Sequence, residues 1–208
     1  MEHTENAAVG CVIMASGRAV RFGSNKLLAD FGSAPLIARA LDVTETPALA
    51  ARVVVTRSPE VAELACKAGA KTILHNLPGR NDTVRLGLEA LLSELPGLVG
   101  CIFLPGDQPL LRKESLEAMA RDFSALDEKE RAILRLGFRA EDGTERLGSP
   151  VLFGSSYFGA LYSLPEGKGG GVVIRQHPES VQAVYAARQE ELEDADTAEE
   201  LERLRKFL

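Results

Sequence analysis

Residues 9–26 read VGCVIMASGRAVRFGSNK, and they carry the clearest structural signal in the chain. Their first part, Val9–Ala15, is almost entirely apolar and is followed by turn-forming residues, which predicts a buried β-strand. The second part combines small residues with three cations, Arg18, Arg21 and Lys26. Small residues let backbone amides approach a ligand closely, and the cations place positive charge at the same point. The stretch therefore predicts a strand that ends in a loop able to hold a polyphosphate.

This loop matches neither of the two common phosphate-binding motifs. Five residues separate Gly17 from Gly23, and Gly23 is not followed directly by Lys-Ser or Lys-Thr, so the loop is not a Walker P-loop. The dinucleotide fingerprint G-x-G-x-x-G is also absent. A surface loop with solvated cations remains the alternative interpretation.

Similar apolar runs recur along the chain and alternate with helical patterns. They cover residues 52–56, 72–75, 99–105 and 132–137. Apolar and polar residues hardly alternate in them, which is typical of strands that are covered on both faces of a sheet. Helical spacing of apolar residues follows Ser58-Pro59, follows residues 81–83, and recurs in 116–123 and 197–208. This alternation predicts an α/β fold with one doubly wound, mostly parallel sheet and helices on both faces. We expect a single domain over residues 1–208, with 137–149 as a hairpin or crossover loop.

Composition narrows the range of partners. The chain has 208 residues with 24 basic and 30 acidic side chains, a net charge of −6 and a pI near 5.2. This balance argues against nucleic acid as the main partner, but it allows a small phosphorylated ligand. No run of 18 apolar residues predicts a membrane span, and residues 1–6 do not resemble a secretory leader.

The cysteines point to a reducing compartment. Cys11, Cys66 and Cys101 are an odd number at wide spacing, which fits neither a disulfide framework nor a zinc site. We interpret all three as small buried apolar residues and expect a cytoplasmic location.

A second decisive stretch, residues 99–111, reads VGCIFLPGDQPLL. Asp107 directly follows the apolar run, in a turn that Pro and Gly make rigid. Ligands of open α/β sheets bind beyond the carboxyl ends of the strands, where the strand order reverses. If this strand neighbours Val9–Ala15, Asp107 faces the first loop and can hold Mg²⁺ together with phosphate oxygens. An aspartate that only caps the turn is the alternative.

Four spaced motifs together resemble a known family. The first is A-x-G-x-x-x-R-(M/F)-G-x-x-K, matched by Ala15, Gly17, Arg21, Phe22, Gly23 and Lys26 and followed by Pro35-Leu36. Residues 106–109, 150–153 and 194–201 match the later motifs in the same order, so the resemblance covers nearly the whole chain. In these positions the sequence resembles the MobA-like nucleotidyltransferases. Residues 79–88, with Arg85-Leu86-Gly87-Leu88, make it most similar to the molybdenum cofactor cytidylyltransferase branch.

The resemblance implies a Mg²⁺-dependent enzyme. It would transfer a nucleotidyl group, preferably CMP from CTP, to the phosphate of a molybdopterin-type cofactor and release pyrophosphate. A molybdenum hydroxylase would then receive the product. Two alternatives stay open: a sugar or alcohol phosphate as acceptor, and a non-catalytic carrier or insertion protein for the cofactor. Such chemistry depends on positioning and charge stabilisation and needs no covalent nucleophile.

The resemblance also assigns roles to individual residues. Arg21, Lys26 and Asp107 would be catalytic, with the two cations neutralising the phosphates. Asp107 and Asp196 would hold the metal, with Asp194 as the other candidate, although Asp196 or Thr197 can instead cap a helix. The residues that would bind the nucleotide are Ala15, Ser16, Gly17, Arg18, Gly23, Asn76, Arg80, Asp82 and Thr83.

Three positions depart from the pattern of the family. Ser16 stands where the cytidylyltransferase branch usually has Ala and the guanylyltransferase branch Gly, and Ala19 replaces a frequent Ser. Ser149 stands where the cytidylyltransferase branch usually has His. The choice of nucleotide and of acceptor is therefore open from sequence. Lys168, in a glycine-rich stretch similar to an acceptor-side loop, and His75, at the end of a predicted strand, are further candidates for the site.

Overall fold

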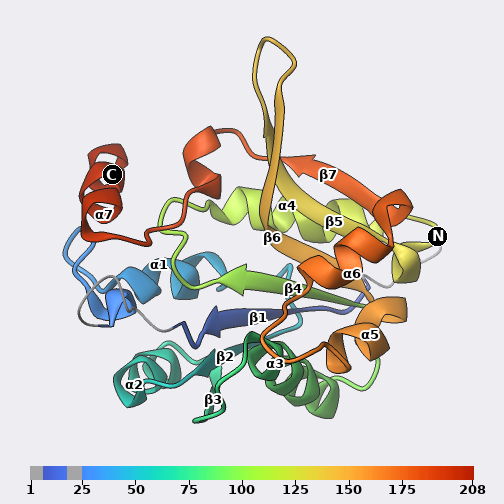
Figure 1. The fold of residues 1–208 in the computed structure, drawn as a ribbon, viewed down its shortest axis with the longest axis horizontal. Helices are drawn as coiled ribbons and strands as arrows, with labels where there is room; N and C mark the ends of the chain where they lie inside the picture. Colours follow the sequence, from blue (N-terminus) through green and yellow to red (C-terminus); the bar gives the residue numbers. More distant parts are fainter. Residues whose placement is uncertain (1–6, 18–24) are drawn as a thin grey trace.

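The computed structural model of the chain describes residues 7–17 and 25–208. Their strands form one mixed sheet of seven strands in the order β3-β2-β1-β4-β6-β5-β7 (Figure 1). All neighbouring strands are parallel except β6, which is antiparallel to both β4 and β5. The strands are β1 (Val9–Ala15), β2 (Ala51–Thr56), β3 (Lys71–Leu74), β4 (Gly100–Pro105), β5 (Ile133–Arg139), β6 (Glu145–Gly154) and β7 (Val181–Tyr185). The predicted α/β fold class is confirmed.

Helices cover both faces of this sheet. Alternate residues of β1 show the division: Cys11 and Ile13 belong to one buried apolar cluster, with residues of α1, α2 and α4. Val12 belongs to a second cluster, with residues of α3, α5 and α6. The helices are α1 (Leu36–Val43), α2 (Pro59–Lys67), α3 (Arg80–Glu94), α4 (Lys113–Ser124), α5 (Phe158–Tyr162), α6 (Gly171–Gln176) and α7 (Ala198–Leu204). None of the helices within the described ranges is both long and apolar enough to cross a bilayer.

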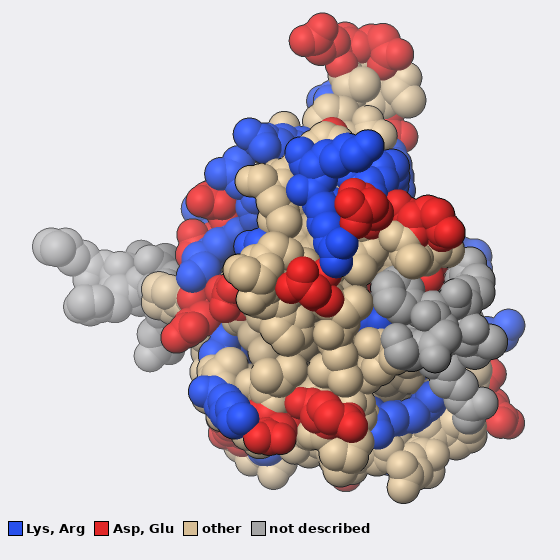
Figure 2. Space-filling view, turned by 90° about the vertical axis from the view of Figure 1, so that its left-hand side faces the viewer, with Lys and Arg blue, Asp and Glu red and all other residues tan. Residues whose placement is uncertain are grey.

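The strand order reverses between β1 and β4. The chain passes from β1 to β2 and β3 on one side, then returns to β4 on the other side of β1. Met14 pairs with Pro105, so the segments that follow the two strands leave the sheet at the same edge. The two strands are neighbours, which meets the condition that the sequence analysis set for Asp107 to face the first loop. Ligands of such sheets bind at this point. Figure 2 looks onto this edge, where acidic and basic side chains are interspersed.

Strands β5 and β6 form the hairpin that residues 137–149 predicted as one of two options. The far end of this hairpin stands away from the sheet in Figure 1, where Arg139 pairs with Glu145. Its projecting part is polar, and this explains why the sequence pattern did not reveal β6 as a strand. Strand β7 was also missed, since it is short and only partly buried.

Two expectations are wrong. Strand β3 is not covered on both faces: it is the edge strand, and none of its four residues is buried. Its polar residues Lys71 and Thr72 fit that position. Cys66 is exposed, whereas Cys11 and Cys101 are buried as expected. On α2 the buried position belongs to Ala65, and the next residue along a helix points about 100° away from it.

Candidate nucleotide-binding site

The centre of the site is the ammonium group of Lys26, which lies between two carboxylates. Its Nζ atom is 2.5 Å from Oδ2 of Asp107 and 2.7 Å from Oδ1 of Asp196. Burial alone would lower the pKa of Lys26, but the charges and hydrogen bonds of Asp107 and Asp196 outweigh it and raise the pKa. The ammonium group therefore stays protonated. The last cation of the first loop and the acidic residue after β4 converge, as the sequence predicted.

Local structure fixes both partners of this contact. Asn25 caps the short helix that begins at Lys26, because its side chain accepts a hydrogen bond from the amide of Leu27 at 3.1 Å. The turn after β4 is tied to β1 by the amide of Gly106, which donates to the carbonyl of Met14 at 3.1 Å. A Cβ atom at Gly106 would lie 3.3 Å from that carbonyl, a tight contact, so glycine favours this close approach of the turn to β1. The carboxylate of Asp107 is thereby directed at Lys26.

The C-terminal segment supplies the second carboxylate. Thr197 caps α7, since its hydroxyl oxygen accepts a hydrogen bond from the amide of Glu200 at 3.1 Å. In return the side chain of Glu200 accepts from the amides of Asp196 and Thr197, both at 2.9 Å. This capping box leaves the carboxylate of Asp196 to contact Lys26. The segment is held to the β4 turn by a hydrogen bond of 2.9 Å from the amide of Ala195 to the carbonyl of Asp107.

A third carboxylate, Asp194, lines the same cleft. Protein atoms crowded around its carboxyl group raise its pKa to about 6, and the negative charges of Asp107 and Asp196 add to the rise. Oxygen donors of this kind suit Mg²⁺ and Mn²⁺. Among the described residues, however, no three potential ligands are close enough to hold an ion by themselves. The donor set fits a metal that also takes oxygens from a bound phosphate, which is the usual behaviour of Mg²⁺.

The cleft around these groups has a volume of about 420 Å³. Predicted residues that line it are Ser16, Gly17, Arg80, Thr83, Asp107 and Asp196. Arg57 also lines it and was missed, although it directly follows β2 and so lies at the expected edge of the sheet. Ser149, noted from sequence only as a departure, lies here too.

Other predicted residues lie elsewhere. Ala15 is buried at the end of β1, and its carbonyl accepts a hydrogen bond from Thr56. Asn76 is exposed and does not line the cleft. Asp82 caps the start of α3, because its carboxylate accepts a hydrogen bond from the amide of Gly79 at 2.9 Å. Arg18, Ala19, Arg21 and Gly23 lie outside the described residues.

Ser16 is held by a histidine from the other side of β2. The amide of Leu77 donates to Nδ1 of His75 at 3.2 Å, so Nδ1 carries no proton. We therefore assign the proton to Nε2, which donates to Oγ of Ser16 at 2.8 Å. The hydroxyl of Ser16 then donates to the carbonyl of Val55 at 3.0 Å. Burial first, and then the positive charge of Arg57, lower the pKa of His75, which keeps the ring neutral.

A second hollow of about 390 Å³ adjoins the cleft and shares Met14, Arg80 and Ser149 with it. We call it the acceptor pocket. Its loop 167–171 lies against α3, where the amide of Gly167 donates to the side chain of Asn81 at 2.9 Å. A Cβ atom at Gly170 would lie 2.9 Å from the ring of Phe153, so only glycine lets the loop pack this closely.

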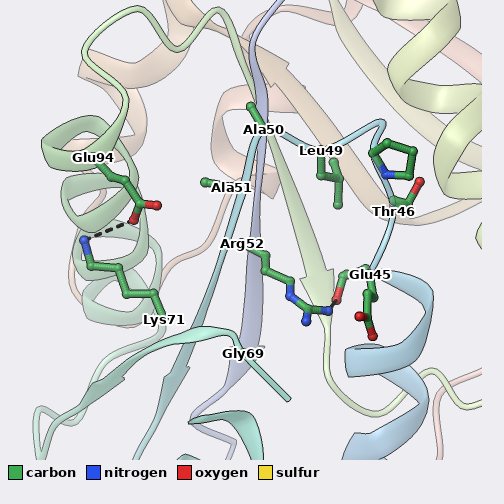
Figure 3. Close-up of a pocket in the computed structure, with 11 residues that line it drawn as sticks. Glu45, Thr46, Leu49, Ala50, Ala51, Arg52, Gly69, Lys71 and Glu94 are labelled. Carbon is green, nitrogen blue, oxygen red and sulfur yellow. Dashed lines mark hydrogen bonds and ion pairs between the residues drawn. The ribbon is translucent and has the colours of Figure 1, made fainter. Parts of the chain in front are cut away.

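A hollow of about 530 Å³ lies at the opposite end of the sheet, beside the start of β2 (Figure 3). Three of its charged groups already have partners: Lys71 pairs with Glu94 at 3.4 Å, and Arg52 donates to the carbonyls of Leu41 and Ala68. The candidate site is therefore the cleft at the carboxyl ends of β1 and β4.

Comparison with known proteins gives the class of this chain. A family model described as "MobA-like NTP transferase domain" matches residues 11–181. The class is therefore that of the nucleotidyltransferases. The chain belongs to the MobA-like NTP transferase family, as the motifs had suggested. No curated protein sequence matches it.

Solved structures share the fold at low sequence identity. A nucleotidyl transferase from Methanothermobacter thermautotroptrophicus, Mth528, has a TM-score of 0.77 and 19% identity, covering 96% of this chain and 97% of that one. Rv0371c from Mycobacterium tuberculosis H37Rv, in complex with manganese, has a TM-score of 0.69 and 20% identity, covering 97% and 100%. CMP:2-keto-3-deoxy-manno-octonic acid synthetase complexed with CTP has a TM-score of 0.74 and 16% identity, covering 97% and 98%.

Proposed function

We propose that this protein transfers a nucleotidyl group, CMP by preference, from a nucleoside triphosphate to the phosphate of a molybdopterin-type cofactor and releases pyrophosphate. The observation that carries the proposal is the position of Lys26 between Asp107 and Asp196, at 2.5 and 2.7 Å, on the edge where β1 and β4 end. The family of the chain and the order of its motifs support the same reaction.

The chemistry fits the charges of the cleft. An oxygen of the acceptor phosphate attacks the α-phosphorus of the nucleotide and forms a new P–O bond. The bond from the α-phosphorus to the bridging oxygen breaks, and pyrophosphate leaves with the electron pair. Lys26 neutralises the departing phosphates once it exchanges its carboxylate partners for phosphate oxygens, and fixed charges of this kind supply much of the catalysis in phosphoryl transfer. We assign the same role to Arg21.

A divalent cation belongs to this proposal. Asp107 and Asp196 would hold it, with Asp194 beside them, and Mg²⁺ is the ion that we propose. When bound, the ion supplies positive charge against the phosphate oxygens. A relative of the same fold has been solved with manganese, which supports a divalent cation at this fold.

The choice of CTP rests on two observations. The sequence resembles the cytidylyltransferase branch, and a structure of the same fold holds CTP. The hydroxyl of Ser16, at the entrance of the first loop, already has both a donor and an acceptor in His75 and Val55. We place the base near Ser16 and His75.

We also propose a partner protein, a molybdenum hydroxylase, that receives the product.

The test is pyrophosphate release by purified protein with Mg²⁺, molybdopterin and each of the four ribonucleoside triphosphates. We expect release with CTP above the other nucleotides, and its absence with every nucleotide would contradict the proposal. Replacing molybdopterin by sugar and alcohol phosphates tests the first alternative acceptor class. Asp107→Ala tests the carrier alternative, because a carrier would bind its ligand without turnover and would not need this carboxylate. Asp122→Ala, at an exposed position on α4, is the matched control.

A further inference from the structure

We propose that Arg135 anchors the phosphate of the acceptor, and that the acceptor pocket selects phosphate monoesters whose remaining part is a flat ring system. This inference rests on the proposed function. It names the chemical class of the second substrate, which is the acceptor of the nucleotidyl group. Its main residue, Arg135, is one that neither the motifs nor the comparisons assign.

The first observation is the environment of Arg135 on β5. Its side chain is partly buried and lines the acceptor pocket. Its guanidinium group donates to the carbonyls of Gly148 at 3.3 Å and Leu147 at 3.1 Å. No carboxylate in the described part of the chain pairs with it, and burial lowers its pKa. A partly desolvated cation that meets only neutral carbonyls has unmet capacity for an anion, and a guanidinium group can bind phosphate through two parallel hydrogen bonds.

The second observation is where this cation lies. The carbonyls that hold it belong to the two residues immediately before Ser149, and Ser149 lines both the cleft and the acceptor pocket. An anion bound by Arg135 therefore lies next to the border between the two hollows. The attacking oxygen has to cross this border to reach the α-phosphate.

The third observation is the chemistry of the pocket walls. Its charged lining residues are all cations, namely Arg80, Arg135, Lys168 and Arg175. Apart from these and the glycines, the lining is apolar, with Ser149 as the one neutral polar side chain among the described residues. The floor carries Phe103 and Phe153, whose rings meet edge to face with centroids 5.9 Å apart. A sugar phosphate would leave several hydroxyl groups unpaired against such walls, and unpaired buried polar groups are costly. A phosphate joined to a flat ring that packs against Phe103 and Phe153 fits them.

The test measures binding of model acceptors by calorimetry while the cleft is filled with the non-hydrolysable analogue α,β-methylene-CTP and Mg²⁺. The probes are phenyl phosphate, glycerol 3-phosphate and phenol. We expect phenyl phosphate to bind at least about tenfold more tightly than either of the others, because only it offers both the anion and the flat ring. Equal binding of glycerol 3-phosphate and phenyl phosphate would overturn the proposal without any variant.

Variants then assign the anion to Arg135. Arg135→Gln should weaken phenyl phosphate at least about tenfold and leave binding of the nucleotide analogue unchanged, and Arg135→Lys should restore part of the loss. The matched control is Arg139→Gln, which removes the same charge from the exposed part of the same strand. If Arg135→Gln does not fold, Arg135→Met, which keeps the length of the apolar stem without the charge, is measured instead, and normal phenyl phosphate binding in this variant would overturn the assignment. Nucleotide binding separates the two proposals: if the wild-type protein binds the analogue but shows no preference for phenyl phosphate, only this inference fails.

Discussion

The two hollows at the edge of the sheet touch one another but differ in their charged groups. The nucleotide cleft has three carboxylates, Asp107, Asp194 and Asp196, around the ammonium group of Lys26. The acceptor pocket is lined by cations and apolar side chains, and no acidic residue of the described chain lines it. The cleft therefore balances its carboxylates with the cations Arg57, Arg80 and Lys26, whereas the acceptor pocket offers cations alone. Under the proposed function, the carboxylates would hold the divalent cation beside the nucleotide phosphates, and the acceptor phosphate would meet only protein cations.

This comparison predicts that substitutions in the cleft change kcat or nucleotide binding, whereas substitutions in the acceptor pocket change acceptor binding. The largest effect is expected for Asp107→Asn, which removes the carboxylate charge without removing its shape. We expect kcat to fall by about 10³, in the range typical for loss of one group that stabilises a transition state, with acceptor binding unchanged. Steady-state kinetics with two acceptors measures it, with Asp122→Asn as control. If kcat of Asp107→Asn falls by less than tenfold, the distinction that we draw between the two hollows is wrong.

Lys26→Ala should show the next largest effect, a loss of about 10²–10³ in rate. It also removes the ammonium group that neutralises Asp107 and Asp196 in the free protein. Affinity for Mn²⁺ without nucleotide should therefore rise while activity falls, which a loss of folding could not produce. Electron paramagnetic resonance of Mn²⁺ measures this affinity, and Lys67→Ala on the exposed face of α2 is the control. A rate within twofold of the parent would refute the role of Lys26.

A smaller effect is expected for His75, which acts through Ser16. His75→Leu should raise KM for the nucleotide by about two- to tenfold, the cost of one lost hydrogen bond, and leave kcat nearly unchanged. His75→Gln keeps a donor and should restore part of the loss. An unchanged KM in His75→Leu would show that Ser16 needs no support.

The pH dependence of stability gives a separate test of His75. Its pKa is lowered in the folded state from an ordinary value of 6.5. Its contribution to the free energy of unfolding is therefore fully present above pH 6.5 and is lost as the pH falls through the lower folded value. Wild-type stability should fall more steeply than that of His75→Gln below pH 6.5, as measured by urea unfolding. Parallel curves would contradict the neutral ring.

The smallest predicted effect concerns Asp194, whose pKa is raised from 3.8 to about 6. A raised pKa contributes stability that is fully present below pH 3.8 and is lost as the pH rises through about 6. Asp194→Asn should therefore have a higher Tm than wild type near pH 8, with the difference vanishing near pH 4. Asp142→Asn is the opposite control, because a hydrogen bond from the amide of Thr144 lowers the pKa of Asp142. Thermal scans across pH would contradict the account if both variants responded alike.

The sequence predicted the centre of the site better than its walls. Apolar runs revealed β1 and β4, and adjacency at the point of reversal was enough to bring Lys26 and Asp107 together. Asp196 stayed ambiguous because Asp and Thr both cap helices, and the choice depends on the capping box that Thr197 forms with Glu200. The capping box is a local signature that points to Thr197 as the cap, whereas the contact of Asp196 with Lys26 is a tertiary one that local pattern does not contain.

The walls depend on pairings that local pattern does not contain. Ser16 and His75 are 59 residues apart in sequence. They follow β1 and β3, and they meet beyond the end of β2, which lies between these two strands. Arg135 interrupts an apolar run, and it lines a pocket because β6 inserts antiparallel between β4 and β5. The place of a residue along its strand decides which face of the sheet its side chain points to, and the order of the strands decides its neighbours. Both together position Ser16 and Arg135.

The most direct test of the central claim is a crystal structure of the protein with α,β-methylene-CTP and Mg²⁺. The account predicts a metal ion in contact with Asp107 and with phosphate oxygens, and Lys26 moved from its carboxylates to the phosphates. A triphosphate bound away from Asp107, or a Lys26 still held between Asp107 and Asp196 beside a fully bound nucleotide, would contradict it.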